Sequence, residues 1–208
     1  MYYLEYYTFW QLFEIKCSIR NDYLIKGQYI LDYIDQLKEI SSRLPQSQVF
    51  NARINFMQHI IDALRNGQIP RHRFIHFELT EAQLTNYLAN NVDPNASDLK
   101  QVLADLELFD KKIADFRTYL QDEFGYWATI TEDLMKTWAD LFPDETYLEL
   151  MAGNGYLSKG FIDQGIQSIA TDDLSWSTES PTGKEQLTTV EQFDAIAAIK
   201  HFKNQVTA

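Results

Sequence analysis

The chain has 208 residues, 45% of them hydrophobic and 23% charged, a balance that is typical of folded globular proteins and excludes an intrinsically disordered one. Its formal net charge is −12 at pH 7, which argues against a nucleic-acid backbone or an anionic membrane surface as the main partner. Cys17 is the only cysteine, so a disulfide framework and a Cys-rich zinc site are excluded, as expected for the reducing cytoplasm.

The first predicted element is a helix with an aromatic face, formed by Tyr3, Tyr6, Trp10, Phe13 and Cys17. We interpret this face as core-facing, and a surface for a ring-bearing substrate or a partner helix is the alternative. The amino terminus lacks the basic region and the small-residue cleavage site of a signal peptide. Because no run of about eighteen apolar residues occurs, we expect a cytoplasmic protein with no membrane partner.

Three further amphipathic helices are predicted before residue 92. They cover residues 22–44, 47–66 and 80–91, and the last opens with the capping-box pattern Thr80-Glu-Ala-Gln83. The helices expose apolar stripes that need partners, so the pattern predicts a bundle.

The segment 68–79 lacks helical spacing and contains Pro70. Ile75, Phe77 and Leu79 alternate with polar residues, as in a short extended segment. His72 and His76 would suit a metal ion only if they shared a helix face, so we predict no metal site.

Asp93-Pro94 resembles a helix cap followed by proline in the first turn. Apolar residues then step by three and four for three heptads: Leu99, Val102, Leu106, Phe109, Ile113, Phe116 and Leu120. We predict one long helix that packs in a bundle with the earlier helices, and a homodimer seam along 98–120 is the alternative. Residues 1–124 are therefore predicted to form a mainly α-helical domain.

Alternating helices and strands are predicted after residue 124. Thr129-Ile-Thr-Glu132 is a second capping box, and it opens a helix that ends near Pro143. Thr146–Leu150 is a short apolar run, typical of a buried parallel strand. Gly153 and Gly155 then permit a sharp turn and the close approach of a ligand to the backbone.

The rest of the chain continues the alternation. A helix starts at Tyr156, and a second strand, 167–173, ends in Asp172 and Asp173. We predict a loop over 174–183, a helix over 189–204 and the first residues of a third strand at 205–208.

Glu149-Leu-Met-Ala-Gly-Asn-Gly155 resembles motif I of the Rossmann-like (class I) S-adenosylmethionine-dependent methyltransferases, an acid followed by G-x-G-x-G. Asp172 stands where that family keeps the acid that binds the ribose hydroxyls. The segment 125–134 is similar to the one that precedes the first strand in some of these enzymes. Met151 departs from the pattern, because it occupies the first glycine position. The resemblance covers roughly residues 125–208.

This resemblance implies a partial Rossmann-like domain at 125–208, with two to three parallel strands, that binds S-adenosylmethionine as cofactor. It implies that Asp172 binds the ribose and that Glu149 acts on the methionine side of the loop. The other implied cofactor contacts are Gly153, Asn154, Gly155, Tyr156, Asp173, Trp127 and Trp176. The sequence assigns neither a catalytic base nor the methyl acceptor, because the acceptor-side residues of the family lie on later strands.

Two alternatives remain for the loop. The NAD fingerprint needs a third glycine where Ser158 stands, and Glu149 would repel its pyrophosphate. The other alternative is a turn without a ligand, in a non-catalytic helical interaction protein that keeps a structural methyltransferase-like remnant. A partial sheet also has open edges, which predicts weak cofactor binding, no turnover by this chain alone, and a homodimer through an edge.

Overall fold

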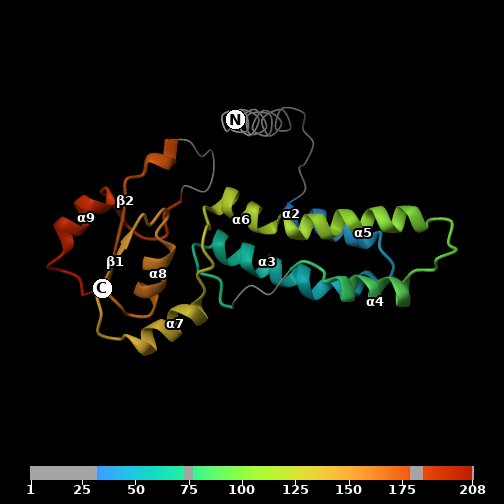
Figure 1. The fold of residues 1–208 in the computed structure, drawn as a ribbon, viewed down its shortest axis with the longest axis horizontal. Coiled ribbons are helices and arrows are strands. Elements are labelled where there is room, and N and C mark those ends of the chain that lie inside the picture. Colours follow the sequence, from blue (N-terminus) through green and yellow to red (C-terminus); the bar gives the residue numbers. More distant parts are fainter. Residues whose placement is uncertain (1–31, 73–76, 179–184, 208) are drawn as a thin grey trace, which may run out of the picture. The chain divides into compact units, whose positions relative to one another are not determined.

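The computed structural model describes residues 32–72, 77–178 and 185–207 (Figure 1). The chain divides into two compact units, Met1–Gln36 and Leu37–Ala208. The predicted aromatic helix, the first ten residues of the helix predicted at 22–44, and residues 73–76 lie outside the described residues. The domain boundary predicted between residues 124 and 125 stays a prediction.

The described chain up to residue 124 is mainly helical, as predicted. Its elements are α2 (Tyr33–Ser42), the short 3-10 helix η1 (Ser47–Phe50), α3 (Asn51–Arg65), α4 (Glu81–Asn91), α5 (Leu99–Ala114) and α6 (Phe116–Phe124). The capping box of α4 is confirmed. The backbone N–H of Gln83 donates to Thr80 Oγ1 (3.2 Å), and that of Thr80 donates to Gln83 Oε1 (3.1 Å).

The helix predicted to begin at Asp93-Pro94 begins five residues later. Asp93 Oδ1 accepts the backbone N–H of Asn95 (2.9 Å), which closes a local turn, and α5 starts after its N-cap residue, Asp98. An aspartate can close such a turn as readily as it caps a helix, and the turn prevailed here. Asp115 separates α5 from α6, although its N–H still donates to Lys111 O at 3.0 Å.

The apolar stripe of α5 and α6 is buried inside the second unit. Its buried members are Val102, Leu106, Phe109, Ile113, Phe116 and Leu120. Phe109 lies against Phe50, with ring centroids 4.6 Å apart. These side chains form an intramolecular core, so they are not available for a homodimer seam.

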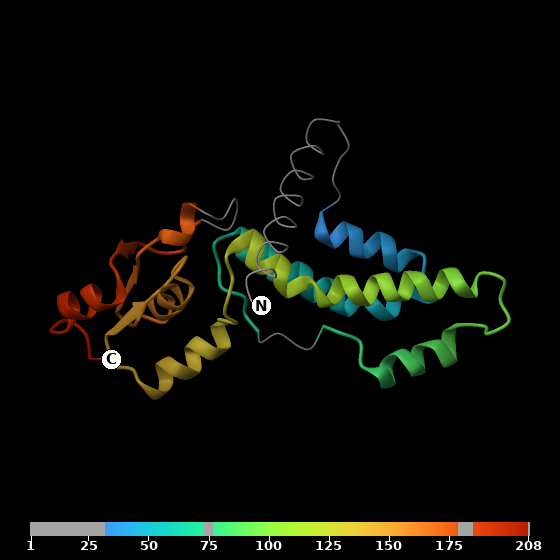
Figure 2. The ribbon, with the colours of Figure 1, turned by 45° about the horizontal axis from the view of Figure 1, so that its top comes forward.

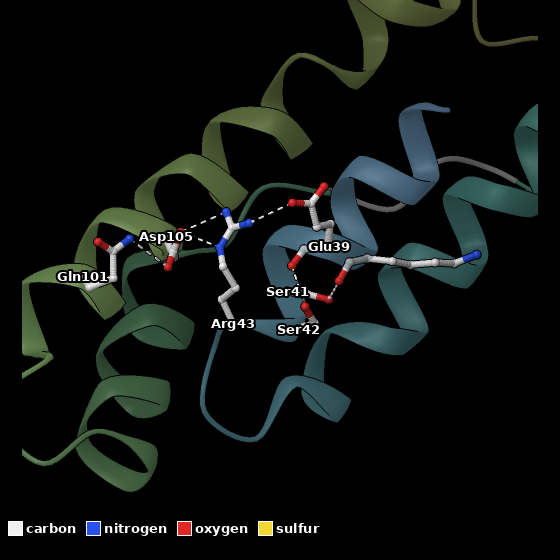
Figure 3. A network of polar contacts seen from close by, with 7 residues as sticks. Glu39, Ser41, Ser42, Arg43, Gln101 and Asp105 are labelled. Atoms are coloured by element: carbon white, nitrogen blue, oxygen red, sulfur yellow. Dashed lines mark hydrogen bonds and ion pairs between the residues drawn. The ribbon is translucent and has the colours of Figure 1, made fainter. Parts of the chain in front are cut away.

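One charged network joins the end of α2 to α5 (Figure 3). Arg43 donates to Asp105 Oδ1 from Nε (3.0 Å) and from Nη2 (2.9 Å), and Gln101 donates to the other oxygen (3.1 Å). Asp105 is 4% exposed. The hydrogen bonds from Gln101 and Arg43 hold the pKa of Asp105 below its ordinary value.

The carboxyl-terminal part contains a parallel sheet, as predicted. Within the described residues its strands are β1 (Tyr147–Leu150), β2 (Ser168–Asp172) and β3 (Val190–Gln192), in the order β1-β2-β3. Both pairs are parallel, with Leu148 opposite Ile169 and Ala170 opposite Val190. The carboxyl ends of all three strands therefore meet at one edge of the sheet.

Helices cover both faces of this sheet (Figures 1 and 2). α7 (Glu132–Leu141) and α8 (Tyr156–Asp163) lie on one face, and α9 (Ala195–Phe202) lies on the other. Gly160 permits the close contact of α7 with α8, because a Cβ there would stand 2.5 Å from Met135 Cγ. Thr131, rather than Thr129, caps α7, since its Oγ1 accepts the N–H of Leu134 at 3.3 Å.

The third strand is Val190–Gln192, not the segment 205–208 predicted from the sequence. Residues 190–192, predicted as the start of a helix, form β3, and the helix begins after Asp194. Asp194 Oδ1 accepts the N–H groups of Ile196 and Ala197, at 3.0 and 2.9 Å, which fixes this later start. Residues 205–207 form no strand, although Thr207 N donates to Thr146 O beside β1 at 2.9 Å.

Candidate functional site

The candidate site is the glycine loop 151–155, which joins β1 to α8 at the carboxyl edge of the sheet. Gly153 and Gly155 have φ of 56° and 75°, the left-handed region that favours glycine. A Cβ on Gly155 would stand 2.8 Å from Thr188 Cγ2, so packing also requires glycine there. A Cβ on Gly153 would meet nothing within 4 Å, so this turn of the backbone faces open space.

Glu149, the motif acid in β1, caps α8. Its Oε2 accepts the backbone N–H of Ser158 at 2.8 Å, in the first turn of the helix. Gly155 precedes that helix and has no side chain to cap it, so Glu149 supplies the missing acceptor from the neighbouring strand. Burial raises the pKa of Glu149, and the nearby charge of Asp172 raises it further.

Asp172 ties two loops together. Its Oδ2 accepts the N–H of Gly153 (2.9 Å), and its Oδ1 accepts the N–H of Leu174 (2.7 Å) and the indole Nε1–H of Trp176 (3.1 Å). Asp172 is only 6% exposed. We call this arrangement, one carboxylate with the three donors Gly153, Leu174 and Trp176, the Asp172 clasp.

Asp173 and Gln192 stand at the same edge and are exposed. Asp173 Oδ1 accepts the N–H of Ser175 at 2.9 Å, and this bond lowers the pKa of the carboxyl. Gln192 Nε2 donates to the backbone oxygen of Asp173 at 3.1 Å. Asp173 is therefore ionised at neutral pH and keeps acceptor positions for an outside donor.

Asn154 and Tyr156 anchor the loop to the end of α6. Both donate to the backbone oxygen of Phe124, Asn154 from Nδ2 (3.2 Å) and Tyr156 from its hydroxyl (2.8 Å). Burial raises the pKa of the Tyr156 phenol. The ring of Tyr126 meets that of Tyr156 edge-on, with centroids 4.9 Å apart. Trp127, next in the chain, is 65% exposed.

The structure thus brings most of the predicted site residues to one sheet edge. Asp172 bonds to Gly153 of the glycine loop, Trp176 bonds to Asp172, and Glu149 bonds to Ser158 in α8. The backbone oxygen of Trp127 accepts from Arg117 Nη2 at 3.4 Å. Leu174 was not among the predicted site residues, because no sequence pattern indicates its φ of 59°. Gln192 was not predicted either, because residues 190–192 were predicted to be helical. Two sequence features indicate the strand: the β-branched Val190, and Asp194, which can cap a helix that begins after it.

The fold and the site define a small parallel α/β unit, with a glycine loop, that follows a helical region. Comparison with protein-family models, with curated proteins and with solved structures finds no match for this chain. Among residues 32–72, 77–178 and 185–207, no helix is long and apolar enough to cross a membrane. The same residues hold no cluster of three or more His, Cys, Asp or Glu side chains suited to a metal ion.

Proposed function

We propose that the carboxyl edge of the sheet binds the adenosyl part of S-adenosylmethionine, and that the protein is a methyltransferase or the cofactor-binding part of one. The observation that carries the proposal is the position of Gly153 and Asp173. An open glycine turn and an exposed carboxylate lie at the ends of adjacent parallel strands, where open α/β sheets bind their ligands.

The residues present fit this cofactor in part. Gly153 leaves room over the loop, and the exposed Asp173 can accept a hydrogen bond from a ligand hydroxyl. Met151 is 80% exposed, so its side chain is free to move away from an incoming ligand. Asp172, by contrast, already accepts from three internal donors.

The cofactor would supply an activated methyl group, and the chain would bind and orient it. Backbone around Gly153 would set how close the cofactor approaches, and Asp173 would accept a hydrogen bond from a cofactor hydroxyl beside Asp172. Holding donor and acceptor in line is the main contribution that a protein makes to this kind of displacement. The methyl acceptor and the base are not assigned. The net charge of −12 disfavours a nucleic-acid acceptor.

A second candidate is a non-catalytic interaction protein whose α/β part is structural. The internal hydrogen bonds of Glu149 and Asp172 favour it, because both motif acids already stabilise the fold. A homodimer through an open sheet edge suits either candidate. The two differ in cofactor binding, which only the first requires.

Isothermal titration of the full chain with S-adenosylhomocysteine tests the proposal. We expect a dissociation constant in the high micromolar range, about −5 to −6 kcal/mol. Asp173→Asn should weaken binding at least about tenfold, because hydrogen bonds to a charged group are worth roughly 1.5–3 kcal/mol each. Asp140→Asn, on the exposed side of α7, is the control and should bind as the wild type does. No binding by the folded wild type would refute the proposal.

A further inference from the structure

Two strained residues flank the Asp172 clasp. Met151, on the glycine loop, has φ of 55°, and Leu174, on the loop after β2, has φ of 59°. Neither is glycine, so each adopts a left-handed backbone conformation that is strained for a residue with a side chain. Such conformations persist only where other contacts hold them, and the two loops therefore need a common restraint.

The clasp is that restraint. Asp172 Oδ2 holds Gly153 of the first loop, and Asp172 Oδ1 holds Leu174 and Trp176 of the second. Trp176 lies in the 3-10 turn η2 (Ser175–Thr178), and the N–H and the hydroxyl of Ser177 both donate to Leu174 O, at 3.1 and 2.7 Å. The η2 turn is thus held to the Asp172 carboxylate by Trp176, and it follows Leu174, whose φ is positive.

A carboxylate offers about four acceptor positions, and three of those on Asp172 are occupied. A vicinal diol needs two positions. One internal donor must leave before a diol can bind to Asp172. Gly153 and Leu174 donate from the backbone, whereas Trp176 donates from a side chain that can rotate away. The indole is the donor that can be displaced at the lowest cost.

We propose that Trp176 is a latch on the candidate site: its indole N–H occupies the Asp172 oxygen that a ligand diol would take, and ligand entry requires the η2 turn to swing away. This inference rests on the proposed function, since it assumes a ligand with the ribose diol of an adenosyl group. The indole and the ligand compete for the same oxygen, so the apparent affinity equals the affinity of the unlatched form multiplied by the fraction of molecules that are unlatched.

Two substitutions shift this equilibrium in opposite directions. Trp176→Phe keeps an aromatic ring and removes the donor, so the open form gains population and S-adenosylhomocysteine should bind about fivefold tighter or more. Leu174→Gly relieves the left-handed strain of the latched turn, so the closed form gains population and the same ligand should bind several-fold more weakly.

Calorimetric titration of the wild type and the two variants tests the latch, with circular dichroism as the check of folding. Opposite shifts of the dissociation constant support it. Equal dissociation constants for wild type and Trp176→Phe would overturn the latch and leave the proposed function standing. An absence of binding by all three folded proteins would overturn both.

A second measurement follows ligand binding in the wild-type protein and uses the variants only to assign one resonance. The four tryptophans give four indole N–H resonances in a 15N-labelled protein, and that of Trp176 is the one lost in Trp176→Phe or moved in Leu174→Gly. Saturating S-adenosylhomocysteine should shift this resonance as the indole leaves Asp172. Binding without any shift of it would contradict the latch.

Discussion

Replacing Asp172 by asparagine should destabilise the α/β part of the protein, whatever the ligand. The carboxylate accepts hydrogen bonds at 2.9, 2.7 and 3.1 Å from Gly153, Leu174 and Trp176. Asparagine keeps one acceptor oxygen and turns the other into a donor. If the asparagine oxygen accepts from Leu174 and Trp176, the asparagine NH₂ group faces the N–H of Gly153. Two donors then face each other, and the N–H of Gly153 loses its acceptor.

The magnitude follows from the number of bonds lost. A hydrogen bond to a charged group is worth roughly 1.5–3 kcal/mol, and a buried donor left unsatisfied costs about 1–3 kcal/mol. Asp172→Asn loses one bond outright and weakens two, which gives a loss of about 2–3 kcal/mol. Asp172→Ala loses all three bonds, so a loss of about 3–5 kcal/mol is expected. Met151 and Leu174 also lose the restraint that holds their positive φ angles.

Urea unfolding, followed by circular dichroism, measures this effect. With an m value of about 1–3 kcal/mol/M, the asparagine variant should unfold at a urea concentration about 0.7–3 M below that of the wild type. Asp173→Asn is the matched control: it makes the same chemical change one residue on, at an exposed side chain, and should leave the midpoint unchanged. Equal midpoints for Asp172→Asn and wild type would refute the structural role of the clasp.

Three other predictions concern stability. Glu149→Ala should cost about 0.5–2 kcal/mol through loss of the α8 cap, whereas Glu149→Gln keeps an acceptor for Ser158. Because the pKa of Glu149 is raised in the folded state, protonation of Glu149 favours folding. In urea melts the wild type should therefore gain stability relative to Glu149→Gln as the pH falls through that pKa toward 4.5. The opposite trend would contradict the raised pKa. Met151→Gly should leave the free energy of unfolding unchanged or raise it by up to about 1 kcal/mol, because the Met151 side chain is 80% exposed and only the strain at its φ angle is removed. A loss of about 2 kcal/mol or more, as a cavity would give, would show that the side chain is packed. Asp105→Asn should lower the free energy of unfolding by about 1–3 kcal/mol at pH 7, through loss of the charged hydrogen bonds to Arg43. Because the pKa of Asp105 is lowered in the folded state, this difference from the wild type should vanish as the pH falls through that pKa, below 3.8. A difference that persists at pH 2 would rule out a stabilising role of the Asp105 charge.

The helices and the first two strands could be predicted because their signals are local. The capping box of α4 and the heptad stripe of α5 and α6 each correspond to contacts that the structure contains. The failures arose where two local signals competed. Asp93 closes a turn instead of capping a helix, and Val190–Gln192 is a strand too short and too polar to show a period.

The position of the candidate site could be predicted from the sequence, but the hydrogen-bond partners of its residues could not. The glycine spacing and the two acids mark the carboxyl edge, because parallel strands place their ends together. Which acid is buried depends on a single residue of register. Asp172 ends β2 and points into the fold, whereas Asp173 follows the strand and is exposed. Leu174 then turns the chain through a conformation that a leucine rarely adopts, and no propensity predicts it.

The double use of the motif acids decides how function must be tested. Glu149 accepts the N–H of Ser158 in α8, and Asp172 accepts that of Gly153 in the glycine loop, so a substitution at either position weakens folding and binding together. Loss of cofactor affinity in an Asp172 variant therefore cannot separate an enzyme from a structural remnant. Asp173 can, because its side chain is exposed at the same edge and its removal leaves the clasp intact. A loss of binding at Asp173 with an unchanged urea midpoint would require a ligand at this edge.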